Sequence, residues 1–297
     1  MLKVVLLEEA KNFHYNYVSK VFNDAIKNKS IRRNNQLVNL PNCFLSFLSN
    51  NFDELISGEP KRLLEIHQEF IKLTFPDIET KIIKEFLLET GYKNFKNKEF
   101  LNLLNIDTCI YCNKNYTLQY DLETNHARAE LDHWFPKNDF PILALSLYNL
   151  IPSCHSCNHI KGASKDYDWL KALENQNHPY CDKNDFSFSY DYKTYNDLSI
   201  KIKVEKDSKT DKTLKFNKTE EVYNAHSNKE LKDLLDLRYK YSENYIDILI
   251  HETFKGVMSK EEVYRMIFGI EIKEEDYHKR PFSKFKHDII EELLRIK

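Results

Sequence analysis

Two Cys-x-x-Cys pairs offer the most specific chemistry in this sequence. Cys109 and Cys112 form the first pair, Cys154 and Cys157 form the second, and 41 residues lie between the pairs. The two-residue spacer lets both sulfurs of one turn face the same ion, so four thiolates can close a tetrahedron around zinc. Because sulfur fills all four positions, the predicted zinc is structural. Redox chemistry of the two dithiols is the alternative.

A carboxylate, an imidazole and an amide accompany the cysteines. Asp132 and His133 end a predicted strand just before Pro136, and Asn158 directly follows Cys157. Carboxylate and amide oxygens are hard ligands that suit Mg²⁺ or Mn²⁺. A neutral imidazole can take a proton from water, since an unperturbed histidine titrates near pH ~6.5. These parts predict metal-assisted hydrolysis of a phosphodiester, with His133 as the general base and Asp132 and Asn158 as ligands of the catalytic metal.

The same window resembles the HNH, or ββα-metal, endonucleases in their zinc-containing form. Their pattern is Cys-x-x-Cys, Asp-His, Asn-Leu and Cys-x-x-Cys-Asn-x-x-Lys. The chain carries every part, in the order Cys109/Cys112, Asp132-His133, Asn149-Leu150, Cys154/Cys157-Asn158 and Lys161. The resemblance implies the same roles for His133, Asp132 and Asn158. It also implies that Asn149 fixes the loop between two strands through hydrogen bonds to the backbone, and that Lys161 is either a phosphate contact or a helix-end residue.

Further segments are similar to the PtuB-like HNH subunits of the Septu and retron anti-phage systems. They are DHWFPK from residue 132, FPILALSLYNLIPSC from residue 140, HPY at 178–180 and RPFSK at 280–284. In that family the HNH protein works with an ABC-type ATPase. This resemblance therefore implies an ATPase partner and a role as the nuclease effector of a defence complex, with DNA as the favoured substrate.

Composition and charge limit the function classes. The 297 residues, of which 41% are hydrophobic, can bury a sizeable core. No apolar run approaches the length of a membrane span or a signal peptide, so we expect a cytoplasmic protein that does not contact a membrane. With five glycines and no Gly-rich phosphate loop, the chain is not expected to bind a nucleotide itself.

The charge balance does not favour a nucleic-acid-binding face. The formal net charge is −2, and residues 101–170 are net negative by three. Nucleic-acid-binding proteins usually carry clustered positive charge. Either folding gathers the lysines on one surface, or a partner supplies part of the affinity for nucleic acid.

Periodicity predicts an α+β protein in three regions. Apolar spacing of three and four predicts helices through the N-terminal scaffold or docking region (1–104), and the zinc-stapled ββα core follows (105–175). In the C-terminal region (176–297), strict alternation over 186–192 and 198–204 predicts a β-hairpin, with a third strand near 214–216. Ser-x-x-Glu patterns predict helices over 227–254 and 259–268, and a last helix covers 283–296.

Several residues keep more than one interpretation. Cys43 and Cys181 are expected to be buried thiols, and Glu130 is either an acid that supports the site or an ordinary strand residue. His126 and His159 flank the site, most simply in solvated or structural roles. The basic run at 278–287 is either a solvated helix face or a contact for phosphate or a partner. Two other functions compete with DNA cleavage, namely cleavage of RNA such as tRNA, and a zinc-stapled binding module without turnover.

Overall fold

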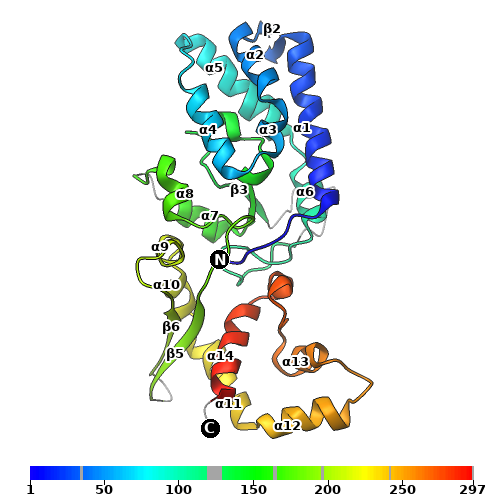
Figure 1. Cartoon of the computed structure of the whole chain (residues 1–297), viewed down its shortest axis with the longest axis vertical. Coiled ribbons are helices and arrows are strands. Elements are labelled where there is room, and N and C mark those ends of the chain that lie inside the picture. Colours follow the sequence, from blue (N-terminus) through cyan, green and yellow to red (C-terminus); the bar gives the residue numbers. More distant parts are fainter. Residues whose placement is uncertain (34–35, 119–128, 163–165, 195–196, 241, 296–297) are drawn as a thin grey trace.

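The computed structural model describes residues 1–33, 36–118, 129–162, 166–194, 197–240 and 242–295. In this part, helices and three two-stranded sheets form a mixed fold. A bundle of helices lies at one end, a hairpin with its following helix lies in the middle, and a C-terminal lobe lies at the other end (Figure 1). None of the helices in these ranges is long and apolar enough to cross a membrane.

The N-terminal helices form as the sequence predicted. α1 presents a buried stripe at intervals of three and four residues, and its first turn is acidic while its last is basic, which suits the helix dipole. A short hairpin that the sequence did not predict follows it. The elements are α1 (Glu8–Asn28), β1 (Ser30–Arg33), β2 (Gln36–Asn39), α2 (Asn42–Asn50), α3 (Phe52–Ser57), α4 (Pro60–Phe70), α5 (Asp77–Glu85) and α6 (Asn97–Leu104).

A tight turn brings this bundle against the central hairpin. The π-helix η1 (Phe86–Gly91) and the 3-10 helix η2 (Tyr92–Asn94) connect α5 to α6. A Cβ atom at Gly91 would lie 2.6 Å from Cδ1 of Leu145, in the loop of the hairpin. The glycine therefore allows the close approach that brings Tyr92 to β3.

The central hairpin and the helix that follows it hold the second cysteine pair and the candidate catalytic residues. β3 (Glu130–His133) pairs antiparallel with β4 (Leu150–Ser153), so that Glu130 lies opposite Ser153 and His133 lies opposite Leu150. The loop between them contains η3 (Pro141–Leu143) and η4 (Leu147–Asn149), and α7 (His155–Gly162) follows β4. The elements therefore follow the predicted order of two strands and a helix. Two short helices, η5 (Trp169–Lys171) and α8 (Ala172–Asn175), come next.

The C-terminal lobe confirms the predicted hairpin and corrects the predicted third strand. β5 (Ser187–Thr194) and β6 (Asp197–Lys203) pair antiparallel. Residues 214–216 instead end a helix, α9 (Lys209–Phe216), which α10 (Thr219–Asn224) follows. The helix forms because Ser208 caps it, with its Oγ accepting a hydrogen bond from the Asp211 N–H at 3.1 Å.

The helix predicted over 227–254 is wrong as a single element. It is divided into η6 (Ser227–Leu231), α11 (Lys232–Lys240), α12 (Glu243–Ile248) and η7 (Leu249–Thr253), and Ser242 caps α12. The next prediction is confirmed, because α13 (Lys260–Phe268) begins with both capping-box bonds between Ser259 and Glu262 and ends at Gly269 with φ 66°. After η8 (Glu274–Lys279), α14 (Ser283–Arg295) confirms the last predicted helix.

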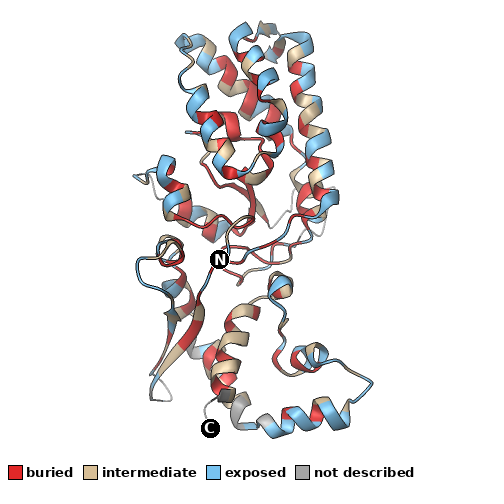
Figure 2. Ribbon diagram, viewed as in Figure 1, coloured by how far each residue is buried: buried red, intermediate tan, exposed pale blue. Residues whose placement is uncertain are grey.

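Two hydrophobic clusters organise the chain. The first joins the N-terminal helices to the central hairpin and the cysteines, and the second fills the C-terminal lobe. Buried residues accordingly gather inside the helical bundle and separately between β5–β6 and α14 (Figure 2). Cys43 is exposed, contrary to expectation, since it lies on the outer face of α2, and Cys181 is half-buried. The region boundaries at 104 and 175 stay predictions.

The C-terminal lobe meets the core at the loop that carries the first cysteine pair. Asn113 lies in the left-handed region with φ 49°. Its Nδ2 donates hydrogen bonds to Tyr277 O at 2.8 Å and to Arg280 O at 3.1 Å, and its carbonyl accepts from Phe282 N at 2.6 Å. Tyr223 Oη donates to Cys112 O at 2.6 Å. Backbone atoms at the start of the basic run at 278–287 therefore form hydrogen bonds with this loop.

Candidate metal centre and adjoining pocket

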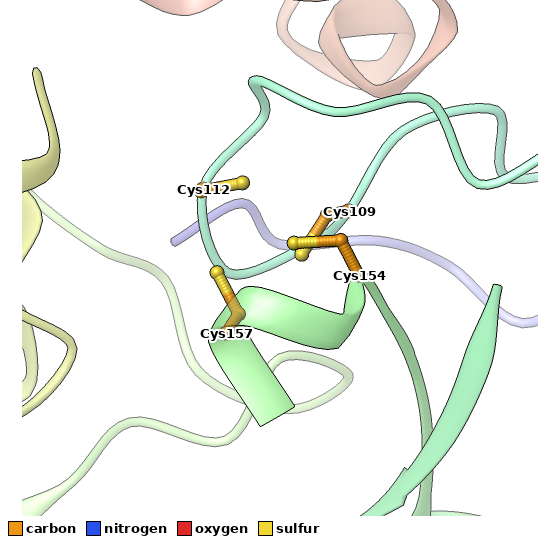
Figure 3. Close-up of side chains that lie close together, drawn as sticks. All are labelled: Cys109, Cys112, Cys154 and Cys157. Atoms are coloured by element: carbon orange, nitrogen blue, oxygen red, sulfur yellow. The ribbon is translucent and has the colours of Figure 1, made fainter. Parts of the chain in front are cut away.

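The four cysteines converge on one point. Cys109 and Cys112 come from a loop, Cys154 immediately precedes α7, and Cys157 lies in its first turn (Figure 3). All four are buried, and their sulfur atoms lie within 4.8 Å of one another. In a zinc tetrahedron with Zn–S bonds of about 2.3 Å, the sulfurs would be about 3.8 Å apart. The cluster can therefore hold a zinc ion after small adjustments of its side chains.

The surroundings of the sulfurs also suit a metal. Asn115 Nδ2 donates to the Cys154 sulfur at 3.2 Å, and the Lys114 backbone N–H donates to the Cys112 sulfur at 3.4 Å. Such donors stabilise thiolates. Burial raises the pKa of the Cys109 thiol well above its usual range. A bound cation is what would let these crowded sulfurs ionise together.

Side chains of β3 alternate between two faces of the hairpin, as a regular strand requires. Asp132 faces α7 and is buried. Its two oxygens accept hydrogen bonds from Lys161 Nζ at 3.1 and 2.8 Å, and Tyr111 Oη donates to one of them at 2.7 Å. The third Lys161 proton goes to the His133 carbonyl. Burial lowers the Lys161 pKa, but Asp132 opposes that shift, so the pair is a neutralised ion pair that fastens α7 to β3.

Glu130 lies on the same face and contacts the first half of α7. Its two carboxylate oxygens bind different side chains, with Asn158 Nδ2 donating to one at 2.6 Å and His155 Nδ1 lying 2.7 Å from the other. The Asn158 amide is therefore oriented by Glu130, and not by direct contact with Asp132. Because Nδ2 points to Glu130, the Oδ1 of Asn158 is the atom left for another partner.

His133 points to the opposite face, toward the helical bundle. Its Nε2 lies 3.1 Å from Ala144 O, and its ring packs edge-on against Tyr92 with centroids 4.3 Å apart. A carbonyl only accepts, so Nε2 carries the hydrogen and Nδ1 is the basic nitrogen. Burial, assisted by the charge of Lys137, lowers the pKa of His133 to about 3. The imidazole is therefore neutral near pH 7.

Asn149 fixes the loop that presents Ala144. Its Oδ1 accepts from Phe135 N at 2.6 Å, and its Nδ2 donates to Phe135 O at 3.2 Å and to Leu143 O at 2.9 Å. These are side-chain bonds to the backbone of the loop, as the resemblance implied. They hold the residue next to Ala144, so Asn149 indirectly sets the orientation of the His133 ring.

An open depression of about 200 Å³ joins the candidate residues. Its lining brings together Asp132, His133 and Asn158, although Asp132 and His133 point to different faces of the hairpin. The lining residues are Leu131, Asp132, His133, Pro136, Lys137, Asn138, Asn158, Lys161 and Gly162.

The structure adds residues that the sequence argument missed. Tyr92, Tyr111 and the Ala144 carbonyl contact His133 or Asp132 from distant parts of the chain, and no local motif marks them. Lys137 follows Pro136 directly, and its position in the DHWFPK segment was the available signal. His159 is exposed and stacks on His155, with ring centroids 6.2 Å apart. His126 lies outside the described residues.

Comparison with known proteins gives one partial similarity. The chain is 32% identical over 88 residues to the Septu protein PtuB of Bacillus thuringiensis. That alignment covers 28% of this chain and 31% of the length of the Bacillus protein. No family model and no solved structure matches the chain. The chain is thus similar to PtuB over less than a third of either sequence, together with a four-cysteine cluster that can bind zinc.

Proposed function

We propose that this chain is a zinc-stapled HNH endonuclease that hydrolyses phosphodiester bonds of DNA with the help of Mg²⁺ or Mn²⁺. The observation that carries the proposal is the state of His133. Its Nε2 donates to Ala144 O, which leaves Nδ1 as the basic nitrogen, and the residue borders a depression shared with Asp132 and Asn158. A general base must be neutral before it takes a proton, and His133 is neutral near pH 7. Its pKa of about 3 lies below the range near the operating pH in which a general base is most efficient.

The reaction follows from that arrangement. A water oxygen attacks the phosphorus, its proton passes to Nδ1 of His133, and the bond from phosphorus to the 3′ oxygen breaks. A divalent cation, when bound, stabilises negative charge on the phosphate and on the departing oxygen. Asp132 and the Oδ1 of Asn158 are the oxygen donors that would hold it, and their chemistry suits Mg²⁺ or Mn²⁺. Because Lys161 already pairs with Asp132, the carboxylate must be shared with, or released by, that lysine.

The similarity to PtuB supports a place in anti-phage defence. By that similarity we propose that the chain is the nuclease effector of a complex with an ATPase subunit. The near-neutral overall charge agrees with this, because a partner can supply part of the affinity for nucleic acid. We expect weak and strongly salt-sensitive binding of DNA by the chain alone, and tighter binding with the partner.

The test is incubation of the purified chain, with Mg²⁺ and then with Mn²⁺, with supercoiled plasmid, single-stranded DNA and tRNA. The reactions are run with and without the candidate ATPase. Nicking or linearisation of plasmid supports the proposal. Cleavage of tRNA alone would replace DNA with RNA as the substrate.

A binding module without turnover is the second candidate. It is favoured by the hydrogen bonds that the Asp132 carboxylate already accepts within the protein. Lys161 and Tyr111 together use three acceptor positions of that carboxylate, which makes it less available to a metal. If zinc-loaded protein binds nucleic acid but leaves all three substrates intact with either metal and with the ATPase, this second function is the better one.

A further inference from the structure

Two lysines border the depression, and their charges have different partners. Lys161 is buried, and its three donors are satisfied by Asp132 and by the His133 carbonyl. Lys137 is half-buried, and its Nζ lies 4.6 Å from the centroid of the Tyr92 ring. Within the described ranges, no carboxylate forms an ion pair with Lys137. The charge of Lys161 is therefore neutralised by Asp132 within the folded structure, whereas the charge of Lys137 is available to a bound anion.

An aromatic ring positions a cation without neutralising it. The ring face attracts the ammonium, but the ring carries no net charge, so the positive charge still acts on the depression. Tyr92 is itself fixed, since its Oη donates to Leu131 O at 3.1 Å and its ring packs against His133. Tyr92 thus holds Lys137 at the edge of the depression, beside the candidate general base.

We propose that Lys137 and the ring of Tyr92 form a phosphate-binding subsite at the mouth of the depression, which takes a backbone phosphate of a nucleic acid strand. This inference rests on the proposed nuclease function and deepens it. Phosphate is the anion that a phosphodiester substrate brings to this place, and a lysine ammonium binds it as a point charge. Since Tyr92 belongs to the N-terminal helical region, that region positions the lysine that would bind the phosphate.

The test measures binding separately from cleavage. A fluorescein-labelled duplex and a labelled single strand are titrated with the parent protein in the absence of Mg²⁺ and Mn²⁺, so that no cleavage is expected, at salt concentrations rising from low ionic strength. Lys137→Ala and Lys93→Ala are compared with the parent under the same conditions. Lys93 is the matched control, because it neighbours Tyr92 in sequence but is 72% exposed and ion-paired with Glu89. Thermal melting verifies that each variant is folded.

We expect Lys137→Ala to weaken binding roughly tenfold at low salt and to reduce the slope of log affinity against log salt by about one. Lys93→Ala should leave both quantities unchanged. Tyr92→Phe, which keeps the ring, should bind as the parent does, whereas Tyr92→Leu should bind several-fold more weakly. Equal affinity and slope for Lys137→Ala and Lys93→Ala would overturn the subsite while leaving the proposed nuclease intact. If the parent fails to bind at the lowest salt even with the candidate ATPase present, the subsite is overturned, and the plasmid assay decides the nuclease separately.

Discussion

The two ends of the β3–β4 hairpin have different neighbours. At one end Glu130 lies opposite Ser153, and the chain continues into Cys154 and the cysteine cluster. At the other end His133 lies opposite Leu150 and borders the depression. α7 begins at the cluster and runs back along the hairpin, so that Lys161 near its end reaches Asp132.

Each end is also held by a different part of the molecule. The C-terminal lobe binds the loop of the first cysteine pair, through Tyr223 and Asn113. The N-terminal helices bind the loop at the other end, where His14 Nε2 donates to Leu145 O at 2.8 Å and Ser146 Oγ donates to Leu55 O at 2.6 Å. Changes at the cysteine end should therefore affect folding first, and changes at the His133 end should affect the reaction first.

Loss of a cysteine should have the largest effect. Cys154→Ser removes one of four zinc ligands, and zinc binding is worth about 10 kcal/mol or more in small zinc modules. We expect the variant to lose zinc, measured by atomic absorption, and to lose its cooperative thermal transition. Cys43→Ser is the matched control, because Cys43 is exposed and outside the cluster. A Cys154→Ser protein that melts like the parent would show that the cluster does not stabilise the fold.

Replacement of His133 should separate chemistry from folding. Removal of the general base in His133→Ala should lower cleavage by about 100- to 10,000-fold. Zinc content should stay at the parent value, because His133 lies at the other end of the hairpin. Rates of plasmid nicking provide the measurement, and His251→Ala, on the exposed face of η7, is the control. Nicking at the parent rate would remove His133 from its assigned role.

Asn149→Ala should affect both stability and chemistry. The substitution removes three hydrogen bonds in a fully buried position, those to Phe135 N, Phe135 O and Leu143 O. We expect a loss of about 3 kcal/mol in the free energy of unfolding, measured with urea, since each buried bond contributes about 1 kcal/mol. Cleavage should fall as well, because the Ala144 carbonyl that orients His133 lies in the released loop. Asn244→Ala, at an exposed site, should change neither quantity.

The pH dependence of stability should give the smallest of these effects. Burial lowers the pKa of the His14 imidazole to about 4, whereas the same imidazole has a pKa near 6.5 in the unfolded chain. Between these pH values the unfolded state therefore binds one proton more than the folded state. The contribution of neutral His14 to the free energy of unfolding is present above pH 6.5 and is lost as the pH falls toward 4. Between pH 6.5 and 5, the free energy of unfolding should fall less steeply in His14→Gln than in the parent, by about 1.4 kcal/mol per pH unit, measured by urea unfolding. Parallel curves for parent and variant would contradict the assignment.

Local sequence predicted the parts of the site that depend on spacing within one element. The two Cys-x-x-Cys pairs predict the cluster, Pro136 predicts the end of the strand at His133, and strict alternation of apolar residues predicts β5 and β6. The pattern failed near Leu214, because the capping residue Ser208 outweighs a short alternation of apolar residues. The contacts of Lys161 with Asp132 and of Tyr92 with His133 join residues 29 and 41 positions apart in the sequence, and no local pattern specifies such pairs.

The conformation of Asn113 has a consequence for how the sequence can drift during evolution. A left-handed backbone at this position favours glycine or asparagine, while the bonds to Tyr277 O and Arg280 O demand an amide donor. Glycine satisfies only the first requirement, glutamine satisfies only the second, and aspartate lacks the donor. Asparagine alone meets both, so substitution should be poorly tolerated at this position although it is not a metal ligand.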